Sequence, residues 1–97
     1  LELGRISTYI NNPAVLDIEC SGPEKPLVIK EAKGIQNTTL LLKEEEIQQI
    51  INEVARLSAT SVQNNILRAS YQGIEFTGII SESVGSRFIV HKKIAPQ

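Results

Sequence analysis

The sequence predicts an α+β domain: an antiparallel or mixed sheet of about six strands with two helices, in the order α-β-β-β-α-β-β-β. Two stretches place apolar residues at steps of three and four, which is the period of one helix face. The other segments are short apolar or alternating runs between Gly, Pro, Asn and Ser, as strands are. Strands grouped before and after a helix favour helices packed on one face of a sheet over a doubly wound α/β fold.

The first helix is expected within residues 1–11, where Leu3, Ile6 and Ile10 form an apolar stripe. Asn12-Pro13 follows, and the residue before a proline is pushed out of helical space. The helix should therefore end by Asn11.

Three strands are predicted after this helix. Residues 15–19 alternate in polarity, with Val15 as the exception, and Ser21-Gly22-Pro23 supplies turn residues before a second run at 26–30. Residues 32–37 contain Gly34 and polar residues, so the third strand is expected at 38–43.

The strongest helix signal begins at Glu44. Three glutamates in succession suit a helix N-terminus, where the backbone dipole favours negative charge. An apolar stripe continues to Leu57, and small polar residues replace it at 58–61; the stripe comprises Ile47, Ile50, Ile51, Val54 and Leu57.

Three further strands are predicted at 66–71, 74–81 and 87–92, with turns at Gln72-Gly73 and Val84-Gly85. If Gln72-Gly73 is a two-residue hairpin, Ser70 faces Glu75, and Arg68 lies diagonally beside Glu75 on the same face.

Composition excludes several classes of protein. The 97 residues carry a net charge of -1, which gives no bulk attraction to nucleic acid or anionic lipid. One cysteine, Cys20, rules out an internal disulfide, and no apolar run approaches the ~20 residues of a membrane span. We expect a soluble, cytoplasmic domain. The chain contains no methionine, so we also expect it to be a piece of a longer protein.

Candidate chemical groups have simpler interpretations. Asp17 and Glu19 alternate as outward polar residues of a strand do, and Cys20 has no base near it in sequence. His91 has no histidine or cysteine at metal-ligand spacing, so no metal site is expected. Glycine-rich phosphate-binding loops of the form Gly-x-x-x-x-Gly-Lys-Ser/Thr are absent from the sequence, so this chain alone should not hydrolyse ATP.

Motifs along nearly the whole chain resemble the N-terminal domain of the ATPases that assemble type II and type IV secretion systems, pili and archaella, in particular the archaeal branch. The family pattern has a short helix ending in Asp/Asn-Pro, then a strand and a Gly-Pro turn. It continues with a block like Pro-Ile-Leu-Asp-Ala-Thr-Leu-x-Asp-Gly-Ser-Arg and closes on Gly-Ser-x-Phe-x-Ile-Arg-Lys. The matching segments here are Asn12-Pro13, residues 15–29, residues 65–75 and residues 85–92.

The resemblance implies a non-catalytic regulatory and assembly domain at residues 1–94, with the start of a linker at 95–97. A RecA-like motor domain that binds ATP and magnesium would follow in the parent protein, and this domain would move over its nucleotide site. Implied partners are the motor domain, neighbouring subunits of a hexamer and membrane secretion platform proteins, with no nucleic acid. The parent would lie in the cytoplasm, peripheral to the membrane.

Family arginines that approach the nucleotide phosphates align with Glu75 and His91 of this chain. A carboxylate cannot stabilise a phosphate, so the expected nucleotide contacts reduce to Lys92, His91 and Arg87, with solvated edge-strand charges as the simpler interpretation. The family's aspartate and arginine become Arg68 and Glu75, which predicts a structural ion pair of reversed polarity. The lost arginines leave open an alternative function, a stand-alone adaptor derived from this domain that acts by protein–protein contact.

Overall fold

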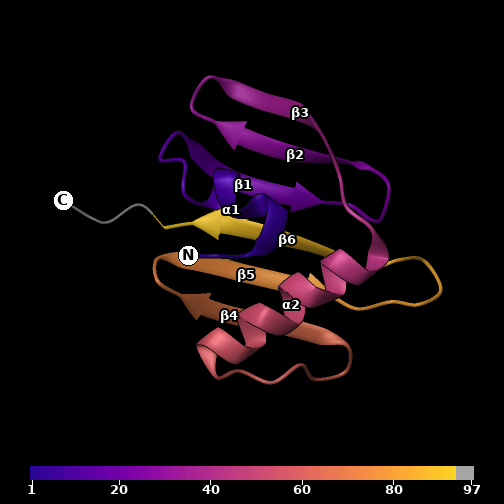
Figure 1. Ribbon diagram of the computed structural model, residues 1–97. Coiled ribbons are helices and arrows are strands. Elements are labelled where there is room, and N and C mark those ends of the chain that lie inside the picture. The colour runs from indigo at the N-terminus through magenta and orange to yellow at the C-terminus, as the bar shows by residue number, and fades with distance from the viewer. Residues whose placement is uncertain (94–97) are drawn as a thin grey trace.

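The fold is a two-layer α+β structure in which one sheet carries both helices on the same face (Figure 1). It is described here from a computed structural model, for residues 1–93. The predicted class and element order are confirmed. The predicted linker start, 95–97, and the last residue of the predicted domain, Ile94, lie outside the described residues.

The sheet has six strands in the order β3-β2-β1-β6-β5-β4, and every pair of neighbours is antiparallel. The first and last strands of the chain therefore lie side by side at the centre. The strands are β1 (Val15–Cys20), β2 (Pro26–Glu31), β3 (Gly34–Leu41), β4 (Ile66–Tyr71), β5 (Ile74–Ile79) and β6 (Arg87–Lys92).

The first helix is short. It begins with a 3-10 turn, η1 (Gly4–Ile6), and continues as α1 (Ser7–Ile10). Leu3, Ile6 and Ile10 are buried, as the stripe predicts. The backbone N–H of Asn11 donates to the Ser7 carbonyl at 2.9 Å, and the chain then turns into β1.

Strand β1 contains a bulge between Val15 and Asp17, seen as a shift in its pairing with β2. A bulge inserts an extra residue and so moves the following side chains to the other face. Val15 and Ile18 are consequently both fully buried although they are three residues apart. This explains why Val15 breaks the alternation of the sequence.

Strand β3 begins four residues earlier than predicted, at Gly34, and ends at Leu41. The glycine and polar residues at 34–37, with Ile35 as the one apolar residue, predict a loop. This stretch is a strand because it pairs with β2 at the edge of the sheet, where most of its side chains are exposed and need no apolar character. Strand β5, in contrast, ends two residues earlier than predicted.

Helix α2 (Glu44–Ser58) lies over β4, β5 and β6 (Figure 1). The Lys43 N–H donates to the Glu46 carboxylate at 3.2 Å, which satisfies one free donor at the helix start. Ala59 adopts a left-handed conformation, φ 53°, and ends the helix where the sequence predicts. The stripe of α2 packs closely on the sheet at Gly78, because a Cβ there would lie 2.8 Å from Ile51 Cγ1.

One apolar core fills the space between the helices and the sheet. The side chains of Phe76 and Phe88 stack at its centre with 5.4 Å between ring centroids. The buried apolar residues are Leu3, Ile6, Ile10, Val15, Ile18, Cys20, Leu27, Ile29, Leu42, Ile47, Ile50, Ile51, Val54, Leu67, Ile74, Phe76, Phe88 and Val90.

Candidate functional site

The sheet has one face that no element among residues 1–93 covers, and we call it the open face. Cross-strand partners point to the same side of a sheet, so the register assigns residues to it. Two rows run across it, from β3 to β4: Ile35, Lys30, Asp17, His91, Glu75 and Ser70 in the first, and Asn37, Val28, Glu19, Ile89, Thr77 and Arg68 in the second.

His91 lies in the middle of the first row, between two carboxylates. Its Nδ1 is 2.5 Å from Asp17 Oδ1 across the β1–β6 pair. Glu75 is its cross-strand neighbour on β5, and Glu75 Oε1 lies 3.5 Å from Lys93 Nζ. The negative charges beside His91 oppose the approach of a phosphate from this side.

His91 also lacks the partners that acid–base catalysis requires. Asp17 orients the ring as the acid of a catalytic triad does, but within residues 1–93 no hydroxyl or thiol is hydrogen-bonded to the imidazole. Cys20 is buried beneath the sheet, and its thiol donates to the Gly22 carbonyl at 3.7 Å. Burial raises the pKa of Cys20, which keeps the thiol neutral.

The three predicted nucleotide contacts do not converge. Arg87 and His91 project from the open face, whereas Lys92 lies on the opposite side of β6, because side chains alternate along a strand. Lys92 Nζ donates to the carbonyls of Tyr9 at 3.0 Å and Asn12 at 2.7 Å. Burial lowers the pKa of Lys92. Its ammonium group fastens the end of α1 to the central strand.

Arg87 forms no ion pair with any residue in 1–93. It borders a small hollow of about 180 Å³ on the open face, which is lined by Glu19, Cys20, Ser21, Thr77, Ile79, Arg87, Phe88 and Ile89. Apolar side chains, one cation and one carboxylate meet there, which suits contact with a protein surface.

The hairpin of β4 and β5 has the predicted geometry. Tyr71 pairs with Ile74 across the two-residue turn Gln72-Gly73, whose φ angles are both positive, and Ser70 faces Glu75. Arg68 faces Thr77, diagonal to Glu75, and a shallow hollow of about 290 Å³ lies beside them. The ion pair that Glu75 forms in this structure is with Lys93.

The sequence did not indicate the polar contacts of the glutamate run. The Glu44 carboxylate accepts from the backbone N–H of Ser86 at 2.8 Å and from its hydroxyl at 2.5 Å. Burial raises the pKa of Glu44, but bonds from Ser86 and Gln48 outweigh it, so the net pKa lies below its ordinary value. Glu46 binds Arg5 at 2.6 Å. Pairs this distant in sequence leave no local pattern by which to find them.

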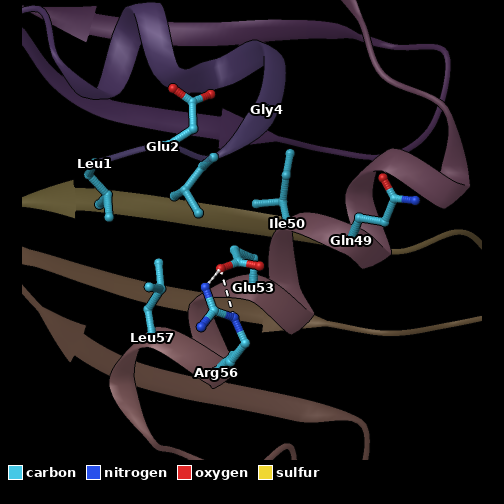
Figure 2. A pocket seen from close by; sticks show the side chains of 9 residues that line it. Leu1, Glu2, Gly4, Gln49, Ile50, Glu53, Arg56 and Leu57 are labelled. Carbon is cyan, nitrogen blue, oxygen red and sulfur yellow. Dashed lines mark hydrogen bonds and ion pairs between the residues drawn. The ribbon is translucent and has the colours of Figure 1, made fainter.

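A larger groove, of about 500 Å³, separates the N-terminal segment from α2 (Figure 2). Leu1, Ile50 and Leu57 face it, and Arg56 turns along the helix to donate to Glu53. Glu2 accepts from the Ser7 hydroxyl at 2.8 Å. The charged groups of Glu2, Glu53 and Arg56 on its rim are thus hydrogen-bonded within the chain.

Two negative findings limit the chemistry of the described residues. No group of three or more His, Cys, Asp or Glu side chains in residues 1–93 could hold a metal ion. No helix in the same range is long and apolar enough to cross a membrane.

Comparison with known proteins gives a fold relative. No protein-family model matches the sequence, and no curated protein matches it. Among solved structures, the VirB11 ATPase from the Brucella suis type IV secretion system, in complex with sulphate, matches with a TM-score of 0.76 and 11% sequence identity. The match covers 92% of this chain and 28% of that chain. The structural match shows that this chain shares its fold with one region of the VirB11 ATPase, and at 11% identity it shows the fold alone.

Proposed function

We propose that this chain is a non-catalytic regulatory and assembly domain of a traffic ATPase that serves a secretion system or assembles pili or archaella, as the archaeal branch of that family does. The fold match to the VirB11 ATPase supports it, because almost the whole chain aligns with little more than a quarter of that protein. The motifs of this chain resemble those of the family's N-terminal domain. The fold match and the motif pattern both support a domain of a secretion ATPase.

In this proposal the parent protein holds a RecA-like motor domain with ATP and magnesium, and works as a hexamer at the cytoplasmic side of a membrane platform. The present domain, residues 1–94, moves on the linker at 95–97 and covers the nucleotide site. The open face is the side that turns toward the motor domain, since it carries Arg87 and His91 on the strand nearest the linker.

We rank the possible phosphate contacts by their surroundings. Arg87 has a permanent charge and no ion-pair partner in residues 1–93, so it is the best candidate. His91 ranks second, because the carboxylates of Asp17 and Glu75 beside it repel a phosphate. Lys92 would first have to release the carbonyls of Tyr9 and Asn12.

Two experiments test the proposal. The gene sequence after codon 97 should encode a Walker A motif within about a hundred residues, a span suited to a motor domain that follows a short linker. A stop codon there would instead support the stand-alone adaptor.

With the parent in hand, the ATPase rate of the full-length hexamer should fall when Arg87 is changed to alanine. Lys33→Ala, in the exposed turn between β2 and β3, is the matched control and should leave the rate unchanged. Equal rates and nucleotide affinities for both variants would remove Arg87 from the nucleotide site.

A further inference from the structure

The two edges of the sheet differ in how far they are closed to a further strand. At the β4 edge a tight turn covers the start of the strand, because the backbone groups of Gln63 and Ile66 hydrogen-bond to each other in both directions at 2.9 Å. The charged residue Arg68 follows on the same strand. A covering turn and a charged side chain both keep an edge strand from pairing with another chain. The β4 edge is thus partly closed.

The β3 edge has neither kind of protection. Its sequence from Gly34 to Leu42 contains no charged residue and no proline. The helices pack on other strands, α1 on β1 and α2 on β4, β5 and β6 (Figure 1). Ile35 is 72% exposed, and Leu41, at the other end of the strand, is 40% exposed. An uncharged edge strand with exposed apolar side chains is a template for strand pairing.

The pairing register shows which backbone groups of β3 its neighbour leaves unused. Glu31 and Gly34 flank the two-residue turn between β2 and β3, so they exchange hydrogen bonds with each other. Bonded and non-bonded pairs alternate along an antiparallel ladder, which makes Gln36 the next residue of β3 that is bonded to β2. The N–H and C=O groups of Ile35 and Asn37 therefore point away from β2, toward solvent.

The available backbone ends at Asn37. The pairing with β2 shifts after this residue, and within that bulge the Thr38 hydroxyl donates to the Leu27 carbonyl at 2.8 Å. Further along, the Arg5 guanidinium donates to the Leu41 carbonyl at 2.7 Å. A further strand can thus pair only with the first half of β3.

We propose that the first half of β3 binds an extended peptide segment of a partner protein, which adds a seventh strand to the sheet. The outward N–H and C=O groups of Ile35 and Asn37 match the acceptors and donors of an extended backbone. The side chains set a preference within that backbone. Lys30 is the cross-strand partner of Ile35, and its ammonium group forms no ion pair within residues 1–93. We expect an aliphatic residue opposite Ile35 and an acidic residue near Lys30.

This inference does not rest on the function proposed above. Arg87 and His91, which that function uses, lie on β6, and β1 and β2 separate β6 from β3. The 97-residue chain has its own core and is a suitable sample by itself.

The first test is a peptide selection. Panning a displayed library of random eight-residue peptides, the length of β3, against the wild-type chain should recover peptides in which aliphatic residues alternate with polar or acidic ones. Asn37→Pro removes an outward N–H but leaves the pairing with β2, and should bind these peptides at least about tenfold more weakly. Asn37→Thr keeps the N–H, and as the matched control should retain the affinity. Circular dichroism should show the same folded spectrum for all three proteins.

The second test locates the bound peptide by amide hydrogen exchange. In the free chain the amides of Ile35 and Asn37 should exchange rapidly, whereas that of Gln36, which is bonded to β2, should exchange slowly. A saturating recovered peptide should slow the exchange of Ile35 and Asn37 by at least about tenfold, since both then donate to it. Amides of the open face, such as that of Ile89, should be unchanged.

The third test reverses the charge beside the edge. Selection against Lys30→Glu should recover basic residues where selection against the wild-type chain recovers acidic ones, because the sign of the nearest free charge is reversed. The same sequences from both chains would contradict the position assigned to the peptide.

Each contrary result overturns the proposal. A selection that enriches no peptide would exclude it, and so would peptides that bind Asn37→Pro as tightly as the wild-type chain. Slowed exchange on β6 instead of β3 would place the peptide on the open face. A wild-type chain that sediments as a dimer held together through β3 would make the occupant a second copy of the chain. The ATPase measurements on the parent are independent of these outcomes, so the failure of either proposal is visible without the other.

Discussion

The two sides of β6 show how one strand serves two purposes. Phe88, Val90 and Lys92 point toward the helices, where the first two are buried in the core and the third binds α1. Arg87, Ile89 and His91 alternate with them and face outward on the open face. The inward set holds the fold together, and the outward set is free to contact another molecule.

Polar groups differ between the two sides in the same way. On the helix side, Glu44 and Lys92 bind backbone groups that would otherwise lose hydrogen bonds on burial. On the open face, ion pairs such as Lys93–Glu75 are exposed to water, which screens them. Substitutions should therefore affect stability on one side and association on the other.

The largest contrast is expected between adjacent residues. Phe88→Ala should lower the free energy of unfolding by about 3–5 kcal/mol, because it leaves a cavity beside Phe76. Ile89→Ala should lower it by less than about 1 kcal/mol. Urea denaturation measures both. Equal effects would mean that the open face is packed as tightly as the core.

A smaller contrast is expected between the two lysines that follow. Lys92→Met keeps the apolar stem but removes the donor to Tyr9 and Asn12, and should destabilise the fold by about 1–2 kcal/mol. Lys93→Met should change stability by less than about 0.5 kcal/mol, since it removes only an exposed ion pair. Thermal unfolding of the two variants compares them. If Lys93 proved the more important, the role assigned to Lys92 would be wrong.

The Glu44 contact should give the stability a pH dependence. The folded-state pKa of Glu44 is lowered, so its contribution is present above the unfolded pKa, about 4.3, and is lost as pH falls through the folded pKa. Glu44→Gln should therefore be less stable than wild type by about 1 kcal/mol at pH 7, with the difference shrinking toward pH 3. Glu45→Gln, one residue along and exposed, is the control and should show no such trend. A constant difference at both pH values would contradict the assignment.

The smallest effects are expected in the β4–β5 hairpin. A double-mutant cycle of Arg68→Ala and Glu75→Ala should give a coupling energy within the 0–1 kcal/mol typical of exposed pairs. The cycle of Glu75→Ala with Lys93→Met should be larger, because Lys93 is the partner that Glu75 has in the structure. A reversed order would restore the predicted Arg68–Glu75 pair.

Sequence patterns predicted the fold well where the signal is local. The stripe from Ile47 to Leu57 and the turn at Gln72-Gly73 gave α2 and the β4–β5 hairpin nearly to the residue. The patterns failed at β3, where a polar edge strand has no apolar alternation, and left Val15 unexplained because a bulge is defined only by the opposite strand. Both misses arise from pairing with β2.

The predicted site residues show the same division. Arg87 and His91 share a face because alternation along a strand is a local property. The partners of His91, Lys92 and Glu44 lie 74, 80 and 42 residues away, on Asp17, Asn12 and Ser86. Without these partners, the sequence could not show which charged residues bind groups within the fold and which are free to bind another molecule.

The sequence by itself determined the order of the elements, the core face of the two helices and the absence of a phosphate-binding loop motif. Those properties depend on neighbours along the chain: the apolar period, the turn residues and the motif spacing. Only the tertiary structure brought β1 and β6 together at the centre of the sheet, bound Lys92 to the carbonyls of Tyr9 and Asn12, and set Asp17 and Glu75 on either side of His91. Strand pairing decides these features, because it joins residues that no local pattern connects.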